Sequence, residues 1–338
     1  MRVLIIGGTG VISTGISNQL LERGGCVLTL FNRGKTAPEI TGQFNVVTGD
    51  RTDFKAFESW AAGQKMFDAV IDMVAFKPAE VESAVRAFKG RTSQYVFCST
   101  TDVYTKPAAQ YPVVEEAERE PAQEFGYAYD KAQCEQVLEK AYARRELAST
   151  VIRPAQTYVD RLVHTFRSDT FWIDRMRKGL PVIVHGDGQS LWAACHRDDV
   201  AAAFVGSVGA EATYGRAYHV TGEEWMTWDQ LYTRVAEAAG APPPDLVHIP
   251  TDLLVKVDPE RAFWCKVNFQ FNNIFDNTRA RSDLGFRYMV PFAEGARRAV
   301  ARLDARGMVA AAESQPWYDR LIDTWSRLGQ DMARHGLR

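Results

Sequence analysis

Short apolar runs alternate with helical patterns along the first half of the chain. Runs such as residues 3–6 are apolar on both faces, as strands are when both faces of their sheet are covered. Residues 17–23 and 79–88 instead repeat their apolar positions with the period of a helix. Strands separated by helices predict an α/β fold with a doubly wound parallel sheet. The strands predicted in this half are residues 3–6, 26–31, 44–47, 69–73, 95–98 and 150–152.

The alternation weakens after about residue 155, where proline and glycine turns become frequent. We therefore predict a doubly wound domain over residues 1–155 and a smaller cap with C-terminal helices, which together take up most of residues 156–338. Residues 217–220 form a further predicted strand that returns to the main sheet, and residues 317–332 form an amphipathic helix.

Composition excludes several classes of protein. The 338 residues carry a formal net charge of -2, so no global basic field would attract nucleic acid or a membrane surface. No apolar run reaches the roughly 18 residues of a membrane span, and the first strand begins at Arg2, before any signal peptide could fit. The five cysteines contain no CxxC pair and the six histidines lack metal-ligand spacing. We therefore expect a cytoplasmic protein without a metal ion.

A glycine turn follows the first strand directly. It reads GGTGVIS from residue 7 to residue 13, with Ser13 where a third glycine would often stand. Such a turn lets the backbone approach a pyrophosphate at the N-terminus of the following helix. The sequence therefore predicts a dinucleotide cofactor held by Gly7, Thr9, Gly10, Val11 and Ile12.

The end of the second strand indicates which dinucleotide is bound. NAD sites usually carry a carboxylate there, whereas this chain has Asn32 followed by Arg33. A guanidinium favours the 2′-phosphate of NADP, although Arg33 would also suit NAD if it only stacked on the adenine. We therefore expect NADP, with NAD as the alternative. Asp50 is expected to accept the adenine amino group, unless it only forms a turn. The other cofactor contacts expected at strand ends are Arg51, Met73, Val74, Ala75 and Pro154.

A candidate proton relay lies in the segment YAYDK. Tyr127 and Lys131 are four residues apart, so they would share one face of a helix. A phenol, with an ordinary pKa of about 10, is a poor base, but a neighbouring ammonium favours the phenolate. Tyr127 could then take a proton from an alcohol, or return one to a ketone, as hydride moves. Thr100, just past a strand end in FCSTTDVY, is expected to hydrogen-bond the same substrate oxygen.

Together these segments resemble the extended short-chain dehydrogenases/reductases of the nucleotide-sugar epimerase/dehydratase type. The resemblance implies a Rossmann domain, a substrate-binding cap and a tightly held nicotinamide cofactor. It also implies that a homodimer is one of the forms in which the chain could assemble. It also places the hydroxyl role on Thr100 and suggests a substrate contact for Lys77, whose alternative is a surface lysine. The segments that carry the resemblance are residues 7–13, 97–104, 127–131, 151–154, 195–200 and 275–277.

The substrate side departs from the sugar epimerases at two positions. Trp192 stands where these enzymes often carry an arginine that clamps the nucleoside diphosphate, and Gln156 replaces a common asparagine. Loss of a charge-assisted clamp leaves a nucleoside-diphosphate substrate in question. The other expected substrate contacts are Lys77, Thr101, Asp102 and His196.

The predicted reaction is epimerisation of a sugar or nucleotide sugar through a transient ketone. Dehydratases of this type use an Asp-Glu pair where this chain has Thr101 and Asp102, and a threonine cannot serve as a carboxylic acid. Elimination is therefore disfavoured. An NADPH-dependent reductase of a ketosugar or small carbonyl compound would use the same relay and is the first alternative. A non-catalytic dinucleotide sensor is the second, although a sensor needs no proton relay.

Overall fold

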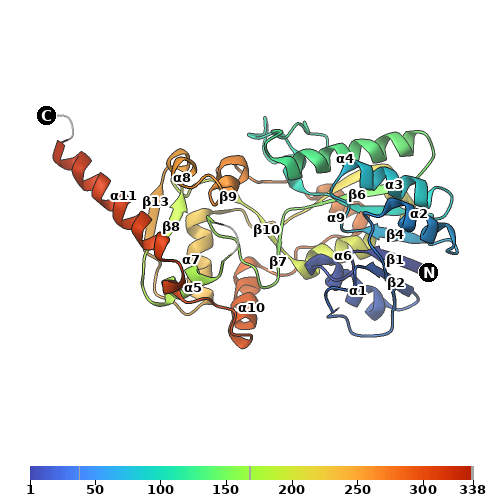
Figure 1. The fold of residues 1–338 in the computed structure, drawn as a ribbon, viewed down its shortest axis with the longest axis horizontal. Helices are drawn as coiled ribbons and strands as arrows, with labels where there is room; N and C mark the ends of the chain where they lie inside the picture. Colours follow the sequence, from blue (N-terminus) through green and yellow to red (C-terminus); the bar gives the residue numbers. More distant parts are fainter. Residues whose placement is uncertain (38, 167–168, 336–338) are drawn as a thin grey trace. The chain divides into compact units, whose positions relative to one another are not determined.

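The computed structural model describes residues 1–37, 39–166 and 169–335, and the chain forms two compact units, each described by itself below (Figure 1). The first unit comprises Met1–Thr157, Ala194–Glu223 and Ile274–Val290. The second comprises Tyr158–Ala193, Glu224–Asn273 and Pro291–Arg338. The first unit thus includes two segments beyond residue 156, because a strand and two helices from them complete its sheet and cover one face.

A seven-stranded sheet in the order β11-β6-β5-β4-β1-β2-β3 forms the centre of the first unit. Every neighbouring pair is parallel, which confirms the predicted doubly wound α/β class. Strands β1, β2 and β3 follow one another towards one edge of the sheet, and β4, β5 and β6 follow one another towards the other edge. The carboxyl ends of β1 and β4, where the strand order changes direction, flank the ligand crevice expected of this fold. The strands are β1 (Arg2–Ile6), β2 (Val27–Asn32), β3 (Asn45–Thr48), β4 (Ala69–Asp72), β5 (Tyr95–Cys98), β6 (Ser149–Pro154) and β11 (Arg216–Val220).

Helices cover both faces of this sheet, which explains why a central strand such as β1 is apolar on both faces. In β1, Val3 and Ile5 belong to the core on one face, while Leu4 and Ile6 belong to the core on the other. Figure 1 shows one face covered by α1 and α6 and the other by α2, α3 and α4. These helices, with α9, are α1 (Val11–Arg23), α2 (Phe54–Ala62), α3 (Pro78–Phe88), α4 (Gly126–Ala143), α6 (Arg197–Ser207) and α9 (Thr278–Leu284).

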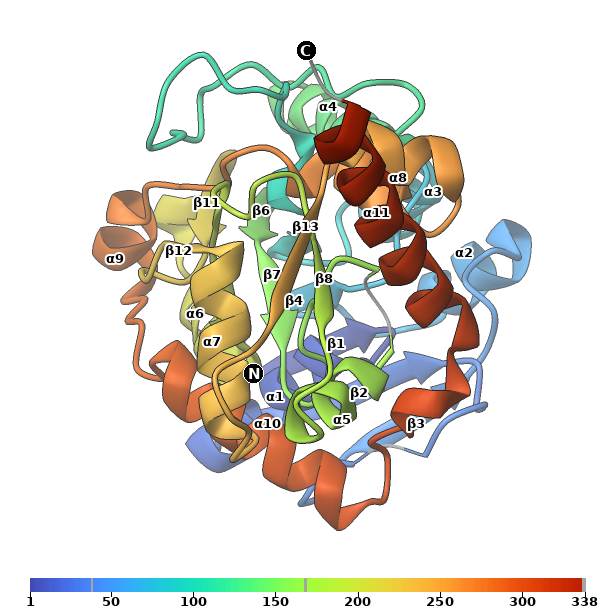
Figure 2. The same ribbon diagram turned by 90° about the vertical axis from the view of Figure 1, so that its left-hand side faces the viewer.

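The second unit is built from short strands and helices around an aromatic core. Strands β8 and β13 pair in parallel and can be followed in Figure 2, and β9 and β12 pair antiparallel. Trp172, Trp228 and Tyr232 are fully buried in this core. The elements are α5 (Phe171–Arg177), β8 (Val182–His185), β9 (Leu191–Trp192), β12 (Met226–Thr227), α7 (Trp228–Ala238), β13 (Leu246–Ile249), α8 (Thr251–Val257), η3 (Cys265–Phe269), α10 (Phe292–Ala305), η4 (Ala312–Ser314) and α11 (Pro316–His335). The remaining short elements of the chain are η1 (Thr101–Val103), β7 (Gln156–Tyr158), β10 (Ala194–His196) and η2 (Glu211–Thr213).

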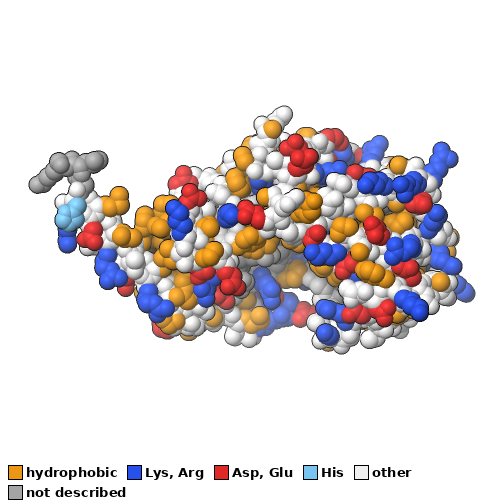
Figure 3. All heavy atoms as spheres, turned by 45° about the horizontal axis from the view of Figure 1, so that its top comes forward, with side chains coloured by type: hydrophobic (Ala, Val, Ile, Leu, Met, Phe, Trp, Pro, Cys, Tyr) orange, Lys and Arg blue, Asp and Glu red, His pale blue; other side chains and the backbone are white. Residues whose placement is uncertain are grey.

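Charges of both signs are interspersed on the face of the molecule drawn in Figure 3. Within the described ranges, no helix is long and apolar enough to cross a membrane. The same residues contain no group of three His, Cys, Asp or Glu side chains arranged to hold a metal ion. All five cysteines are free thiols.

Candidate active site

The glycine turn between β1 and α1 is shaped for a close backbone approach. Gly7 has a φ of +84°, and a Cβ there would lie only 2.3 Å from the Cγ1 atom of Val74. The Ser13 hydroxyl donates to the Gly7 carbonyl oxygen at 2.8 Å and accepts from the Gly10 N–H at 2.8 Å. Serine therefore serves where a third glycine is common, because its side chain closes the turn onto the helix.

The start of α1 fits the pyrophosphate of a dinucleotide. Gly10 and Val11 are exposed there, and Thr9 is half-buried. The first turn of α1 carries no acidic residue, so its N–H groups and the helix dipole present a positive end. Ile12 instead packs against the hydrophobic core under the sheet. The backbone groups of Thr9, Gly10 and Val11 would hold the pyrophosphate, whereas Ile12 anchors the helix to the core.

Asn32 supports the glycine turn from the neighbouring strand. Its side-chain oxygen accepts a hydrogen bond from the Gly8 N–H at 2.8 Å. The next residue, Arg33, is exposed, which leaves its guanidinium accessible at the end of β2. Asp50 lies beyond β3 and accepts from both the N–H and the hydroxyl of Thr52, at 2.9 and 2.7 Å. Both bonds end on Oδ1 and lower the pKa of the Asp50 carboxyl. Asp50 thus forms a turn with Thr52, and its contact with adenine stays a prediction.

Arg51, expected to contact the cofactor, points into the protein instead. Its side chain is 5% exposed, and its guanidinium lies 3.0 Å from the carboxylate of Asp72. It also stacks over the ring of Phe57, with 5.4 Å from the guanidinium carbon to the ring centroid. A buried arginine needs buried anionic partners, and those of Arg51 follow it by at least twenty-one residues in the chain. The local sequence GDR gives no sign of them.

Lys131 is held at the first turns of α4 by two backbone carbonyls. Its side chain is 2% exposed, and its ammonium donates to the oxygens of Ala75 at 2.8 Å and Cys98 at 2.6 Å. The rings of Phe76 and Phe97 lie 4.7 and 4.6 Å from the same nitrogen. Burial lowers the pKa of Lys131. Since an ammonium has three N–H donors, one remains for a cofactor or substrate oxygen.

Tyr127 lies one turn before Lys131 on the same helix. Its side chain is 38% exposed, and its ring is 6.4 Å from the ring of Phe76, centroid to centroid. Phe76 therefore lies next to both residues: the Lys131 ammonium is over its ring, and the Tyr127 ring is beside it. The structure thus brings together an accessible phenol and a buried ammonium next to the loop that follows β4.

Thr100 is the second residue after β5 and is buried. Its hydroxyl oxygen accepts from the Asp102 N–H at 3.1 Å and so caps the short helix η1. With that lone pair occupied, the Thr100 hydroxyl hydrogen can be donated to a substrate oxygen. Thr101 is buried in η1, and the Asp102 carboxylate lies 3.6 Å from the Lys106 ammonium. Asp102 is therefore held in an ion pair beside the threonine.

The expected substrate contacts of the first unit differ in their surroundings. Lys77 is exposed and forms an ion pair with Asp130, which lies between Tyr127 and Lys131 in the chain. His196 is buried and caps α6, because its Nδ1 atom accepts from the Asp198 N–H at 3.3 Å. Gln156 is half-buried in β7.

The remaining predicted contacts lie at the carboxyl ends of the sheet strands or in the second unit. Met73, Val74 and Ala75 follow β4, and Pro154 ends β6. Trp192 belongs to the second unit, is 4% exposed, and packs against Trp228 and Phe269 at centroid distances of 5.2 and 5.1 Å. Trp192 is a core residue of that unit.

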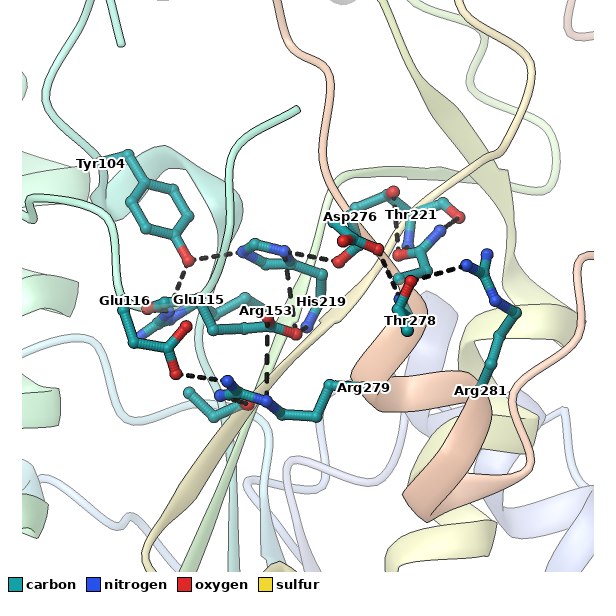
Figure 4. A network of polar contacts seen from close by, with 12 residues as sticks. Tyr104, Glu115, Glu116, Arg153, His219, Thr221, Asp276, Thr278, Arg279 and Arg281 are labelled. Atoms are coloured by element: carbon teal, nitrogen blue, oxygen red, sulfur yellow. Dashed lines mark hydrogen bonds and ion pairs between the residues drawn. The ribbon is translucent and has the colours of Figure 1, made fainter. Parts of the chain in front are cut away.

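A buried polar network that the sequence analysis missed lies beneath the carboxyl ends of β6 and β11 (Figure 4). Arg153 donates twice to the Glu135 carboxylate, at 2.9 and 2.6 Å, and once to the Tyr104 hydroxyl at 2.5 Å. The Tyr104 hydroxyl in turn lies 2.5 Å from the Nε2 atom of His219, whose Nδ1 atom donates to the Asp276 carbonyl oxygen at 3.0 Å. The available signal was a charged residue, Arg153, directly after the apolar pair Val151 and Ile152 of the same strand.

The directions of these bonds fix the protonation state of His219. The Arg153 guanidinium can only donate to the Tyr104 oxygen, so the phenol hydrogen points to Nε2 of the imidazole. Burial lowers the pKa of His219 to about 3, in agreement with a neutral ring. The network joins Tyr104, the residue after η1, to β6 and β11 and thereby supports the segment that follows Thr100.

Comparison with known proteins places this site in a family. The model of the NAD dependent epimerase/dehydratase family matches residues 3–221, from β1 to the residue after β11. The chain belongs to this family. This membership confirms the prediction of an enzyme of the extended short-chain dehydrogenase/reductase type. The family is described as NAD-dependent.

The relatives carry names of different kinds, a binding protein, a reductase and an epimerase. The chain is 28% identical over 260 residues to the chloroplast stem-loop binding protein of 41 kDa b from Arabidopsis thaliana, covering 73% of this chain and 65% of that protein, just under two thirds. It is 28% identical over 245 residues to the 2'-dehydrokanamycin reductase of Streptomyces kanamyceticus, covering 72% and 68%. The crystal structure of UDP-glucose 4-epimerase with UDP-glucose from Thermotoga maritima is similar with a TM-score of 0.73 and 20% identity, covering 90% and 99%, which supports the fold.

Proposed function

We propose that this protein reduces a ketone group of a sugar-like substrate with NADPH. Bound NADPH would supply a hydride to the carbonyl carbon. Tyr127 would donate its phenolic proton to the carbonyl oxygen, so that the ketone becomes a secondary alcohol. Thr100 would hold the same oxygen with its hydroxyl hydrogen, and the Lys131 ammonium would stabilise the phenolate left on Tyr127.

One observation carries this proposal. The Lys131 ammonium is buried, and among the described residues two carbonyl oxygens, those of Ala75 and Cys98, accept from its three N–H groups. It lies one helical turn from Tyr127, an exposed phenol of the same helix. A non-catalytic sensor would have no use for a buried cation next to an accessible phenol, since burial of a charge is unfavourable.

The preference for NADPH is supported by the end of β2. Asn32 is engaged with the Gly8 N–H, and no carboxylate stands there for the 2′-hydroxyl of NAD. The exposed guanidinium of Arg33 is suited to a 2′-phosphate.

The placement of Trp192 favours reduction over epimerisation. An epimerase must present both faces of its ketone to the nicotinamide, which requires an anchor on a remote part of the substrate. At the position where sugar epimerases often carry a diphosphate-clamping arginine, the Trp192 side chain is buried among Trp228 and Phe269. Reduction needs only one face, and one relative is named 2'-dehydrokanamycin reductase. Epimerisation through a transient ketone is the second candidate, supported by the family model and by the similarity to a UDP-glucose 4-epimerase fold.

A single labelling experiment separates the two candidates. The protein is incubated with NADPH carrying deuterium at C4 and with 2′-dehydrokanamycin or a set of ketohexoses, and in parallel with UDP-glucose without added cofactor. Carbon-bound deuterium in an alcohol product, with one NADP⁺ formed per product, supports the reductase. Conversion of UDP-glucose to its 4-epimer in heavy water without deuterium at carbon supports the epimerase. Turnover by the Tyr127→Phe control at the wild-type rate would contradict both.

A further inference from the structure

The loop between β4 and α3, residues 73–77, has its backbone held by two buried carboxylates. Asp72 accepts from the N–H groups of Val74 at 3.0 Å and Ala75 at 2.9 Å. Glu80 accepts from the next two N–H groups, those of Phe76 at 2.5 Å and Lys77 at 2.9 Å. Four consecutive N–H groups are therefore bound by two side chains, one on each side of the loop.

Arg51 is the cation that these two carboxylates share. Its guanidinium lies 3.0 Å from the Asp72 carboxylate and 3.8 Å from that of Glu80, and it donates to the Glu80 carbonyl oxygen at 3.1 Å. The Tyr95 hydroxyl donates to the second oxygen of Asp72 at 2.7 Å. Burial takes both carboxylates out of water, and the guanidinium beside them supplies an opposite charge that offsets this cost.

The same loop carries the groups that surround the proton relay. The Ala75 carbonyl oxygen accepts from the Lys131 ammonium, and the Phe76 ring lies under that ammonium and beside Tyr127. Val74 packs against Gly7, where it leaves no room for a Cβ. A change in the loop would therefore reach the catalytic lysine and the cofactor turn together.

We infer that Arg51 is a positioning residue for Lys131, acting through Asp72, Glu80 and the β4–α3 loop. The inference rests on the proposed proton relay of Tyr127 and Lys131. Loss of the guanidinium charge releases the loop, moves the Ala75 carbonyl and shifts the ammonium away from the phenol. The phenolate of Tyr127 is then less stabilised, so Tyr127 releases its proton at a higher pH.

The titration of Tyr127 tests this without a substrate. Tyrosinate absorbance is followed against pH in the protein with bound NADP⁺, and the curve of the matching Tyr127→Phe protein is subtracted. We expect Arg51→Gln to raise the midpoint of Tyr127 by about 1 pH unit, a tenfold change in proton affinity. Arg51→Lys, which restores a cation, is expected to return the midpoint towards the wild-type value.

A matched control separates positioning from general destabilisation. Arg175 is equally buried, in the second unit, where it pairs with Asp319 at 2.8 Å. Arg175→Met is expected to lower the melting temperature without moving the Tyr127 midpoint. An unchanged midpoint in Arg51→Gln would overturn the role of Arg51 alone. A wild-type Tyr127 that titrates at the ordinary value of about 10 would overturn the relay itself.

Hydrogen exchange in the wild-type protein keeps the inference testable if the Arg51 variants do not fold. Because one guanidinium holds both carboxylates, the amides of residues 74–77 are expected to open together, with similar protection factors. Protection of 74 and 75 alongside free exchange of 76 and 77 would show two independent halves and overturn the inference.

Discussion

The Lys131 ammonium donates to the Ala75 carbonyl oxygen at 2.8 Å, so that helix α4 and the loop after β4 meet at one buried charge. A second bond, to the Cys98 oxygen, joins the end of β5 to the same nitrogen. Lys131 thus links three segments of the first unit. The members of the proposed relay can be tested one at a time.

Removal of the Tyr127 hydroxyl should abolish proton transfer with little effect on cofactor binding. The Tyr127→Phe ring keeps its place beside Phe76, because that contact involves the ring and not the oxygen. We expect turnover to fall about 10²- to 10⁴-fold, the usual contribution of a general acid. NADPH affinity, measured by fluorescence titration, should stay within a few-fold of wild type. A parallel loss of affinity would mean that the hydroxyl serves binding instead.

Thr100 should respond to the loss of its hydroxyl more strongly than its neighbours do. Thr100→Val removes both the donor proposed for the substrate and the cap of η1, a loss of about 0.5–2 kcal/mol in stability. Thr100→Ser retains the hydroxyl and is expected to keep most of the turnover, which separates chemistry from stability. Thr101→Val and Asp102→Asn are expected to change the rate much less. Were Asp102→Asn the most damaging of the four, its carboxylate would have a chemical role and elimination would have to be reconsidered.

The exposed guanidinium of Arg33 should determine the preference for NADPH. We expect Arg33→Ala to weaken NADPH binding by roughly 10- to 100-fold, the equivalent of a charge-assisted hydrogen bond, and to leave NADH binding nearly unchanged. Lys35→Ala, two residues further along the same exposed loop, serves as the matched control. The affinities of both variants for NADPH and NADH are measured by titration. Equal affinities of the wild-type protein for the two cofactors would remove the basis for this assignment.

Stability should fall as the pH falls below about 6.5, in part because of His219. Burial lowers its pKa from about 6.5 to about 3, so between these values only the unfolded chain binds a proton at this site. More protons on the unfolded state means that stability is full above pH 6.5 and is lost progressively towards pH 3. From pH 7 to pH 5 the loss from one such group is about 2 kcal/mol.

Urea unfolding at the two pH values measures this contribution. His219→Gln is less stable at pH 7, since it loses the bonds to Tyr104 and Asp276, but its further loss on going to pH 5 is expected to be about 2 kcal/mol smaller than that of wild type. The variant is expected to remain pH-dependent because of buried His164 and His185. Burial lowers their pKa values to about 3 and about 4. The same pH dependence in wild type and variant would show that His219 does not titrate in this range.

The sheet was predictable because its determinants are local. Each of its seven strands contains a short apolar segment, and the structure places the strands within one or two residues of the predicted bounds. The glycine turn was equally readable, since its backbone requirements appear in the sequence as Gly7 and Gly10. The helix register that brings Tyr127 and Lys131 to one face follows from their spacing alone.

Side chains whose partners are distant in the chain could not be placed in this way. Arg51 stands in what reads as a polar turn, and its burial depends on Asp72 and Glu80, which the fold brings to it. Trp192 reads as a ligand-facing aromatic residue until Trp228 and Phe269 close around it. In both cases a tertiary contact, and not the local pattern, decides whether the side chain faces solvent or the core.

The hydrogen bond from the Gly8 N–H to Asn32 has a consequence for how such a protein can change over generations. An aspartate has the same shape as asparagine, would accept that N–H equally well, and would add at the end of β2 the carboxylate that is typical of NAD sites. Codons for asparagine and aspartate differ by one base. A lineage with this turn is therefore a single point mutation from that carboxylate, without any rearrangement of the backbone that holds it.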